Sequence, residues 1–215
     1  MPDLPRRPHA KPVMSDPISP PQSSLRDCCL AALGHLVPPG VDAPELALVQ
    51  ELARHSPLDR LGPAFHNHLG HAPTALTHLT RALQLRPVEV FALVLLICVE
   101  SEPIVGRACA CLQAPLGGSR PTLGLLVQAY AQLEQDRPPL THLATLTTGV
   151  GVRTGLFQFV QPEAPLAERM LALPTHLLLA LCDQDAAYPT QSPVFDADPD
   201  LHLPRREDGG LGRVG

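Results

Sequence analysis

A histidine cluster is the first set of side chains in this chain that could do chemistry. His66, His68 and His71 fall within six residues, and His68 and His71 would share a face of any helix that continued past Gly70. A structural zinc normally has four ligands, with cysteines or fixed carboxylates among them, and neither CxxC nor HExxH occurs. We interpret these residues as polar surface histidines, with metal binding left as the alternative.

Six cysteines could act as nucleophiles or form disulfides. None forms CxxC, and an even count in a chain of this length without a secretory signal is a weak argument for disulfides. Buried thiols behave as small hydrophobes and resist ionisation, and no GxSxG or similar nucleophile motif is present. We expect reduced, buried cysteines and no catalytic residue. The cysteines are Cys28, Cys29, Cys98, Cys109, Cys111 and Cys182.

Nucleotide binding is not expected from this sequence. A Walker A motif needs a glycine-rich turn followed by lysine and Ser or Thr, and the only lysine is Lys11, in a proline-rich stretch. Residues 117–120, Gly-Gly-Ser-Arg, form a glycine-rich turn before a helix that could hold an anion weakly. We favour a plain turn there and expect no cofactor.

The amino-acid composition limits which binding partners and which cellular compartment we expect for this protein. The net charge of −5 argues against a nucleic-acid binder, which normally carries a basic face. Arg6, Arg7 and Lys11 are followed by no apolar segment, so we predict no signal peptide. The apolar run at residues 90–99 is shorter than the roughly 20 residues that span a bilayer. We therefore expect a cytoplasmic protein without a membrane contact.

Proline placement predicts the domain boundaries. Many of the 26 prolines lie near the two ends of the chain. We expect a disordered proline-rich head at residues 1–22, one helical domain at residues 23–183, and a disordered acidic tail at residues 184–215. Within the domain, 45% hydrophobic and 3% aromatic residues across the chain predict a core of Leu, Ala and Val.

Cap residues predict the first helices. Ser24 with Asp27 three positions later has the pattern of a capping box. Asp42 and Thr74 are expected to cap two further helices, with a less regular segment between them at residues 57–70.

Residues 87–100 give the strongest helical signal. Pro at the first position and Glu89 at the third suit a helix start, and an almost wholly apolar segment predicts a helix surrounded by others. A buried strand is the alternative, because several of its residues are β-branched. A helix capped by Thr122 and running to Asp136 is expected later in the chain.

In the C-terminal part of the domain, the predicted secondary structure changes from helices to a turn and a β-hairpin. Glycines at 149, 151 and 155 predict a turn after a short helix at residues 140–147. Residues 156–160 read as a strand, and residues 166–173 as a return strand or a helical turn. Three helices followed by a hairpin are the order of a winged helix. The predicted fold is mainly α, a helical bundle with a winged-helix-like unit and one β-hairpin.

Several short motifs also follow one another in a familiar order. Residues 85–89 read Leu-Arg-Pro-Val-Glu before a leucine-rich run, residues 106–113 read Gly-Arg-Ala-Cys-Ala-Cys-Leu-Gln, and residues 120–125 read Arg-Pro-Thr-Leu-Gly-Leu. With the hairpin and closing helix at residues 156–181, this part of the chain resembles the N-terminal winged-helix domain of bacterial AAA-type ATPases. The matching family motifs are Leu-Ser-Pro-Phe-Glu, Gly-Arg-Leu-Tyr-Ala-Tyr-Leu-Gln and Arg-Pro-Thr-Val.

The resemblance implies a fold and an auxiliary role, without ATPase activity. Some family members are encoded with contractile, phage-tail-like injection systems, where the ATPase is thought to serve assembly or loading. No ATPase module follows the similar region, and Arg86 replaces the serine that would cap the helix. The expected function is a non-catalytic docking or regulatory module, with an ATPase or injection-system component as its protein partner.

The docking surface is predicted at Arg120, Pro121 and Thr122. Arg120 beside the free N–H groups of a helix N-terminus would favour a partner carboxylate; alternatively, Thr122 only caps its helix and Arg120 is solvated. A DNA-binding winged helix is the second functional hypothesis. Its candidate recognition helix, residues 123–136, carries no Lys or Arg, so we favour a protein partner.

The first prediction concerns nucleotides. Because the Walker lysine and its loop are missing, the purified chain should neither bind a fluorescent ATP analogue saturably in the presence of magnesium nor release phosphate from ATP above the buffer blank. Saturable binding at micromolar nucleotide would contradict the assignment of a non-catalytic module.

Overall fold

The computed structural model describes residues 24–70 and 74–182. The disorder expected for residues 1–22 and 184–215 therefore concerns segments outside the described ranges.

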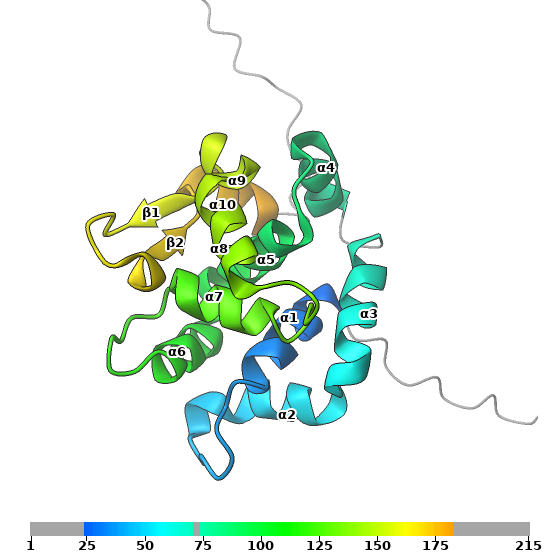
Figure 1. Ribbon diagram of the computed structural model, residues 1–215, viewed down its shortest axis with the longest axis vertical. Coiled ribbons are helices and arrows are strands. Elements are labelled where there is room, and N and C mark those ends of the chain that lie inside the picture. Colours follow the sequence, from blue (N-terminus) through cyan, green and yellow to red (C-terminus); the bar gives the residue numbers. More distant parts are fainter. Residues whose placement is uncertain (1–23, 71–73, 183–215) are drawn as a thin grey trace, which may run out of the picture. The chain divides into compact units, whose positions relative to one another are not determined.

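Helices form most of the described part of the chain, with one two-stranded antiparallel sheet. The mainly helical fold with one hairpin is therefore confirmed (Figure 1). In chain order the elements are α1 (Leu25–Gly34), η1 (Pro44–Leu46), α2 (Ala47–His55), α3 (Leu58–Leu69), α4 (Thr74–Leu83), α5 (Pro87–Ser101), α6 (Pro103–Leu112), α7 (Leu123–Tyr130), α8 (Pro139–Thr148), α9 (Val150–Arg153), β1 (Gln158–Val160), η2 (Leu166–Glu168), β2 (Met170–Ala172) and α10 (Thr175–Cys182).

The capping box predicted for the first helix is present. The backbone N–H of Asp27 donates to Ser24 Oγ at 3.1 Å, and the Ser24 N–H donates back to the Asp27 carboxylate at 3.0 Å. Each bond satisfies an N–H that the start of a helix leaves unpaired. The helix so begun, α1, contacts α2, α3, α5 and α7.

Two predictions for the next segment are wrong. Asp42 does not cap the second helix, because the 3-10 turn η1 intervenes and α2 begins only at Ala47. Residues 58–69 form a regular helix, α3, although Pro63 lies inside it. Pro63 removes one helical hydrogen bond. Burial of Leu61 and Phe65 on one face offsets that loss.

Helix α5 is the centre of the fold, and the alternative of a buried strand is wrong. It contacts α1, α6, α7, α8 and α10, which explains why apolar residues surround its axis (Figure 1). Phe91 of α5 packs edge-on against Phe65 and Tyr130, at ring-centroid distances of 6.1 and 5.5 Å. Three of the seven aromatic residues of the chain, Phe65, Phe91 and Tyr130, therefore pack together where α3, α5 and α7 meet.

The C-terminal helices differ from the prediction in two places. Helix α7 ends at Tyr130 rather than Asp136, and the glycine-rich turn contains the four-residue helix α9. Both alternatives for residues 166–173 occur in succession, as the 3-10 turn η2 and then strand β2. The hairpin pairs Gln158 with Ala172, Phe159 with Leu171 and Val160 with Met170.

A single bridge between Thr122 and Met170 adds the residue before α7 to the hairpin. The chain then follows the order of a winged helix, from the β-bridge through α7 and α8 to β1 and β2, with α9 inserted before β1. In that order α8 stands in the position of the recognition helix, rather than the residue 123–136 segment expected for it.

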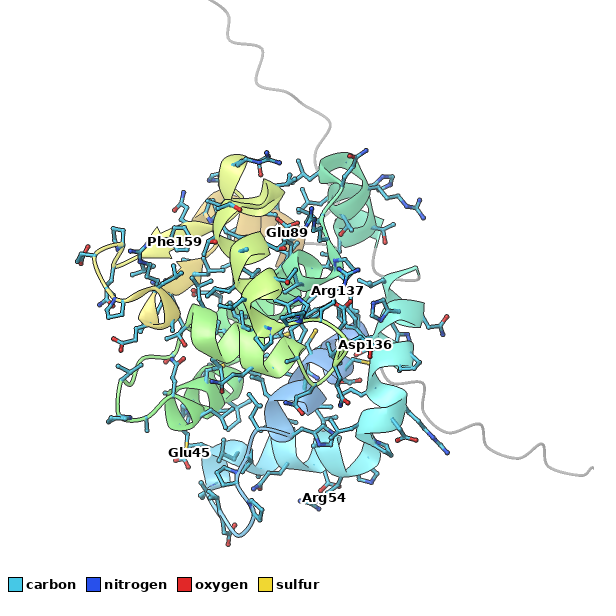
Figure 2. The ribbon with its side chains drawn as sticks, viewed as in Figure 1. Glu45, Arg54, Glu89, Asp136, Arg137 and Phe159 are labelled. Carbon is cyan, nitrogen blue, oxygen red and sulfur yellow. The ribbon has the colours of Figure 1, made fainter. Side chains whose placement is uncertain are left out.

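A buried carboxylate joins the start of α5 to α9. Glu89 is 1% exposed, and its carboxylate accepts from the backbone N–H of Arg86 at 2.9 Å and of Gly151 at 2.7 Å. Figure 2 shows Glu89 within the fold, in contrast to Arg54 at the edge of α2. A Cβ atom on Gly149 would lie 2.5 Å from Glu89 Oε1 and 2.2 Å from the Thr145 carbonyl oxygen, so a larger residue does not fit there.

Glu89 is therefore predicted to be a major determinant of stability. Glu89→Ala leaves two backbone donors without an acceptor, one of them buried, and should lower the free energy of unfolding by about 3 kcal/mol. Glu89→Gln keeps one acceptor oxygen and should lower the free energy of unfolding by less than Glu89→Ala does. Urea unfolding measures both, with exposed Glu163→Ala as the matched control at under about 0.5 kcal/mol. Equal losses for Glu89→Ala and Glu163→Ala would contradict this role.

Candidate functional site

The exposure predicted for the docking surface is wrong at two of its three residues. Pro121 and Thr122 are buried, because this segment runs beside β2 and forms the bridge to Met170. The Leu123 N–H, at the N-terminus of α7, donates to the Arg169 carbonyl at 2.8 Å. This end of α7 is therefore covered by the hairpin, a contact between distant segments that local sequence does not reveal.

Arg120 remains exposed but is not a free cation. Its Nε donates to Glu100 Oε1 at 2.9 Å. Thr122 caps α7 as predicted, with Oγ1 accepting from the Leu125 N–H at 3.2 Å. The structure thus shows a cap and an ion pair, and binding of a partner by Arg120 stays a prediction.

Gln113, which sequence reasoning missed, organises this region. Its buried amide nitrogen donates to the carbonyl oxygens of Gly118 at 2.7 Å and Arg120 at 2.8 Å, and its amide oxygen accepts from the Thr122 N–H at 3.1 Å. Gly117 and Gly118 have φ angles of 68° and 88°, which favour glycine. The turn thus wraps its carbonyls around an amide donor. A glutamine at a helix end before paired glycines was the available signal.

The histidine cluster gives no metal geometry in the described residues. His66 is exposed, and its Nδ1 lies at hydrogen-bonding distance, 2.9 Å, from the Gly62 carbonyl oxygen within α3. His68 is half-buried, and His71 lies outside the described residues. Within the described ranges no group of three His, Cys, Asp or Glu side chains could hold a metal ion.

Four cysteines of the described part, Cys28, Cys29, Cys98 and Cys109, are buried as expected. Burial raises the pKa of Cys28 to about 11 and that of Cys109 to about 12, and it raises the pKa of Cys29 well above its usual value. These thiols therefore stay protonated at neutral pH and are poor nucleophiles. The prediction that the cysteines are buried is wrong for Cys111, because its side chain is exposed on α6.

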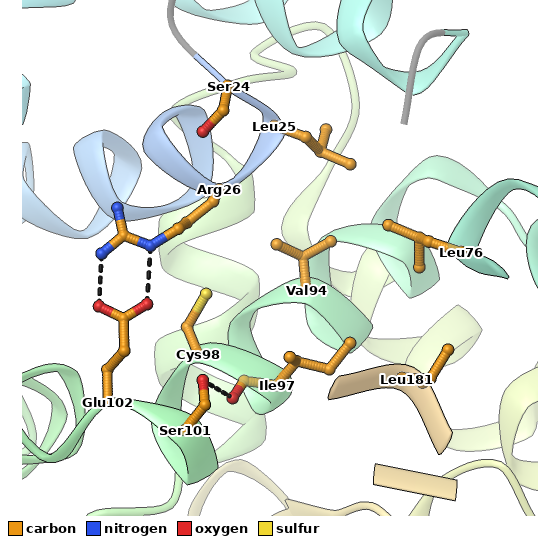
Figure 3. Close-up of a pocket in the computed structure, with 10 residues that line it drawn as sticks. All are labelled: Ser24, Leu25, Arg26, Leu76, Val94, Ile97, Cys98, Ser101, Glu102 and Leu181. Atoms are coloured by element: carbon orange, nitrogen blue, oxygen red, sulfur yellow. Dashed lines mark hydrogen bonds and ion pairs between the residues drawn. The ribbon is translucent and has the colours of Figure 1, made fainter. Parts of the chain in front are cut away.

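An apolar pocket of about 280 Å³ opens where α1, α4, α5 and α10 meet (Figure 3). Its floor is one face of α5, formed by residues at helical spacing, and Ile97 on this face is only half-buried. Apolar side chains of this kind would hold another apolar side chain rather than an ion. The lining residues are Ser24, Leu25, Arg26, Leu76, Val94, Ile97, Cys98, Ser101, Glu102 and Leu181.

An ion-pair network forms the rim of the pocket. The Arg26 guanidinium makes a bidentate contact with Glu102, with Nε donating to Oε1 at 2.7 Å and Nη2 to Oε2 (Figure 3). Its Nη1 also donates to Asp27 Oδ1 at 2.9 Å. The hydrogen bond from Arg26 lowers the pKa of Glu102. Partial burial acts to raise the pKa of Asp27, but bonds from Ser24 and Arg26 outweigh it and the pKa is lowered.

Comparisons with protein families, characterised proteins and solved structures find no match to this chain. Among the helices of the described segments, none is long and apolar enough to cross a membrane.

The rim network predicts a specific acid dependence of stability. Carboxylates with lowered pKa values contribute fully above their ordinary pKa, and the contribution is lost as pH falls through the folded-state value, from about pH 5 downward. Arg26→Gln should therefore cost about 0.5–1 kcal/mol at pH 7, a small effect because the network is partly exposed to solvent. The difference from the wild type should shrink steadily as pH falls, because protonation of the two carboxylates removes the ion pairs.

Urea unfolding at pH 7, 4 and 2 measures this difference. Arg107→Gln is the matched control, because Arg107 is an exposed arginine of α6. A loss in Arg26→Gln that stays constant across the pH series would contradict an electrostatic origin.

Proposed function

We propose that this chain is a non-catalytic, cytoplasmic docking or regulatory module. Its partner is a protein, either an AAA-type ATPase or a component of a contractile injection system. The sequence resemblance supports the choice of partner, and the high pKa values of the buried thiols agree with a module that performs no nucleophilic catalysis.

The exposed face of α8 is the observation that carries this proposal. Leu140 is 75% exposed, more than any other large apolar side chain in the described ranges. Thr141, Ala144 and Thr148 extend the same exposed surface, and Arg86 and Arg153 lie beside them. On the opposite face His142 and Leu146 are buried, so the helix has one fixed orientation. An exposed apolar anchor on such a helix suits a pocket on a protein partner.

A DNA-binding winged helix is the second candidate, supported by the order of the elements. A helix that enters the major groove needs basic or amide side chains for phosphates and base edges. The ten residues of α8 include no Lys, Arg, Asn or Gln. Just before it, Arg137 pairs with Glu134 at 3.0 Å. The lack of basic and amide side chains on α8 therefore favours the protein partner.

Leu140→Ser separates the two functions. It should weaken binding to an AAA-type ATPase or injection-system partner at least tenfold in calorimetry, because the apolar anchor is lost, and should change the free energy of unfolding by less than about 0.5 kcal/mol. Leu116→Ser, in another exposed leucine of the described part, is the matched control and should leave binding unchanged.

The wild-type chain should also leave duplex DNA unshifted at micromolar protein and low salt. A salt-dependent shift would favour the second candidate. Neighbouring genes for tail sheath, tube or baseplate would support an injection-system partner, and an unchanged affinity in Leu140→Ser would overturn the proposed surface.

A further inference from the structure

Another pocket, of about 300 Å³, carries two cations beside the exposed face of α8. Arg86, which precedes α5, and Arg153, at the end of α9, both line it. Both arginines are exposed, and within the described ranges neither forms an ion pair with a carboxylate. The pocket therefore presents two guanidinium groups that can bind an anion. The other lining residues are Thr141, Ala144, Thr145, Thr148, Gly149 and Val150.

The backbone that carries each arginine is held by Glu89. The Arg86 N–H donates to the Glu89 carboxylate at 2.9 Å, and the Gly151 N–H, two residues before Arg153, donates to it at 2.7 Å. The Arg86 guanidinium also reaches α8, where its Nη1 lies 3.4 Å from Thr145 Oγ1. Because both backbone segments are already fixed, less conformational entropy is lost when the two side chains close on one ligand.

The charge around the pocket favours a ligand with a single negative charge. Gly149 lines the pocket, and the Glu89 carboxylate lies against it, since a Cβ atom on Gly149 would be 2.5 Å from Glu89 Oε1. The two arginines and Glu89 together carry a net charge of +1. A carboxylate neutralises this charge and accepts paired N–H bonds from a guanidinium, whereas a phosphate dianion would leave a negative charge beside buried Glu89.

The pocket and the proposed docking face share residues. Thr141, Ala144 and Thr148 line the pocket and also belong to the exposed face of α8 that carries Leu140. Leu140 and Thr148 are about 12 Å apart along the helix axis, at about 1.5 Å per residue. A protein that covers Leu140 and continues along α8 therefore reaches the two arginines.

A nucleic-acid phosphate suits this part of the surface less well than a protein carboxylate. A duplex binds through many phosphate contacts, most of them from basic side chains. The ten residues of α8 include no Lys or Arg, and the hairpin loop, residues 161–168, contains two glutamates and no basic residue. These two elements therefore supply no further cation for a duplex.

We infer that Arg86 and Arg153 form a carboxylate site beside the exposed face of α8, and that this site receives an aspartate or glutamate side chain of the protein partner. Leu140 supplies the apolar contact and the two arginines supply the charged one, so the partner is held at two places along α8. The site follows from the pocket, whereas the source of the carboxylate rests on the proposed function.

Reversible disulfide tethering tests the carboxylate site in the full chain without a partner. Ala144→Cys places a thiol in the pocket, in a background with Cys182→Ser. Cys111, exposed on α6 one helical turn after Arg107, is the matched control within the same molecule. The chain is equilibrated with mercaptopropionate or with its neutral analogue mercaptopropionamide, and peptide mapping measures the mixed disulfide at each cysteine.

The carboxylate should be preferred in the pocket alone. At position 144 the mixed disulfide with mercaptopropionate should be at least fivefold more abundant than that with the amide, and Arg86→Gln combined with Arg153→Gln should reduce this preference to less than twofold. At Cys111 the preference should stay below twofold in both backgrounds. A preference at position 144 that survives the loss of both arginines, or one equally large at Cys111, would overturn the site.

Two further ligands test the source of the carboxylate. Succinate at micromolar concentration should leave the preference at position 144 unchanged, and duplex DNA should bind neither the wild-type chain nor the double arginine variant. Suppression by succinate would assign the pocket to a small dicarboxylate, and duplex binding that requires the arginines would assign it to nucleic acid. Either result would overturn the protein carboxylate.

The tethering result and the Leu140→Ser result separate this inference from the proposed function. No carboxylate preference at position 144, together with a partner affinity that depends on Leu140, would overturn the carboxylate site and leave the docking face. A clear preference, together with a partner affinity that Leu140→Ser does not change, would overturn the docking face and support the site.

Discussion

The buried carboxylate of Glu89 is the constraint on which the C-terminal half of the domain depends. A buried carboxylate needs hydrogen-bond donors from the protein, and the backbone N–H groups of Arg86 and Gly151 donate to Glu89. One bond closes the first turn of α5, and the other holds the start of α9 against it. Because Gly149 and Gly151 pack against this carboxylate, the path from α8 to the hairpin is tied to the central helix. The orientation of the exposed α8 face follows from this attachment.

Local chemistry made much of the fold predictable. The Ser24–Asp27 capping box, the Pro87 start of α5 and the Thr122 cap are short-range patterns, and the structure contains all three. The hairpin also follows from its sequence. By contrast, α3 could not be predicted locally, because the burial of Phe65 against α5 and α7 outweighs the proline within that helix.

The candidate sites were less predictable than the fold, since they depend on contacts between distant residues. Pro121 and Thr122 are buried because the hairpin returns to pair at Met170, far along the chain. The Arg26–Glu102 pair joins residues 76 positions apart. A solvated Arg120 was a reasonable expectation from charge alone, but Glu100 on α5 pairs with it. The α8 face became a candidate only when the structure showed which side of that helix is buried.

Hydrogen exchange at the Gly151 amide tests most directly whether Glu89 fixes α8 and α9 on the central helix. A buried N–H held by a buried carboxylate should exchange only through global unfolding, so its exchange free energy should equal the free energy of unfolding measured in urea. The amides of α8 should be protected to a similar degree. Exchange of Gly151 several kcal/mol below the global value, through local opening, would contradict the account.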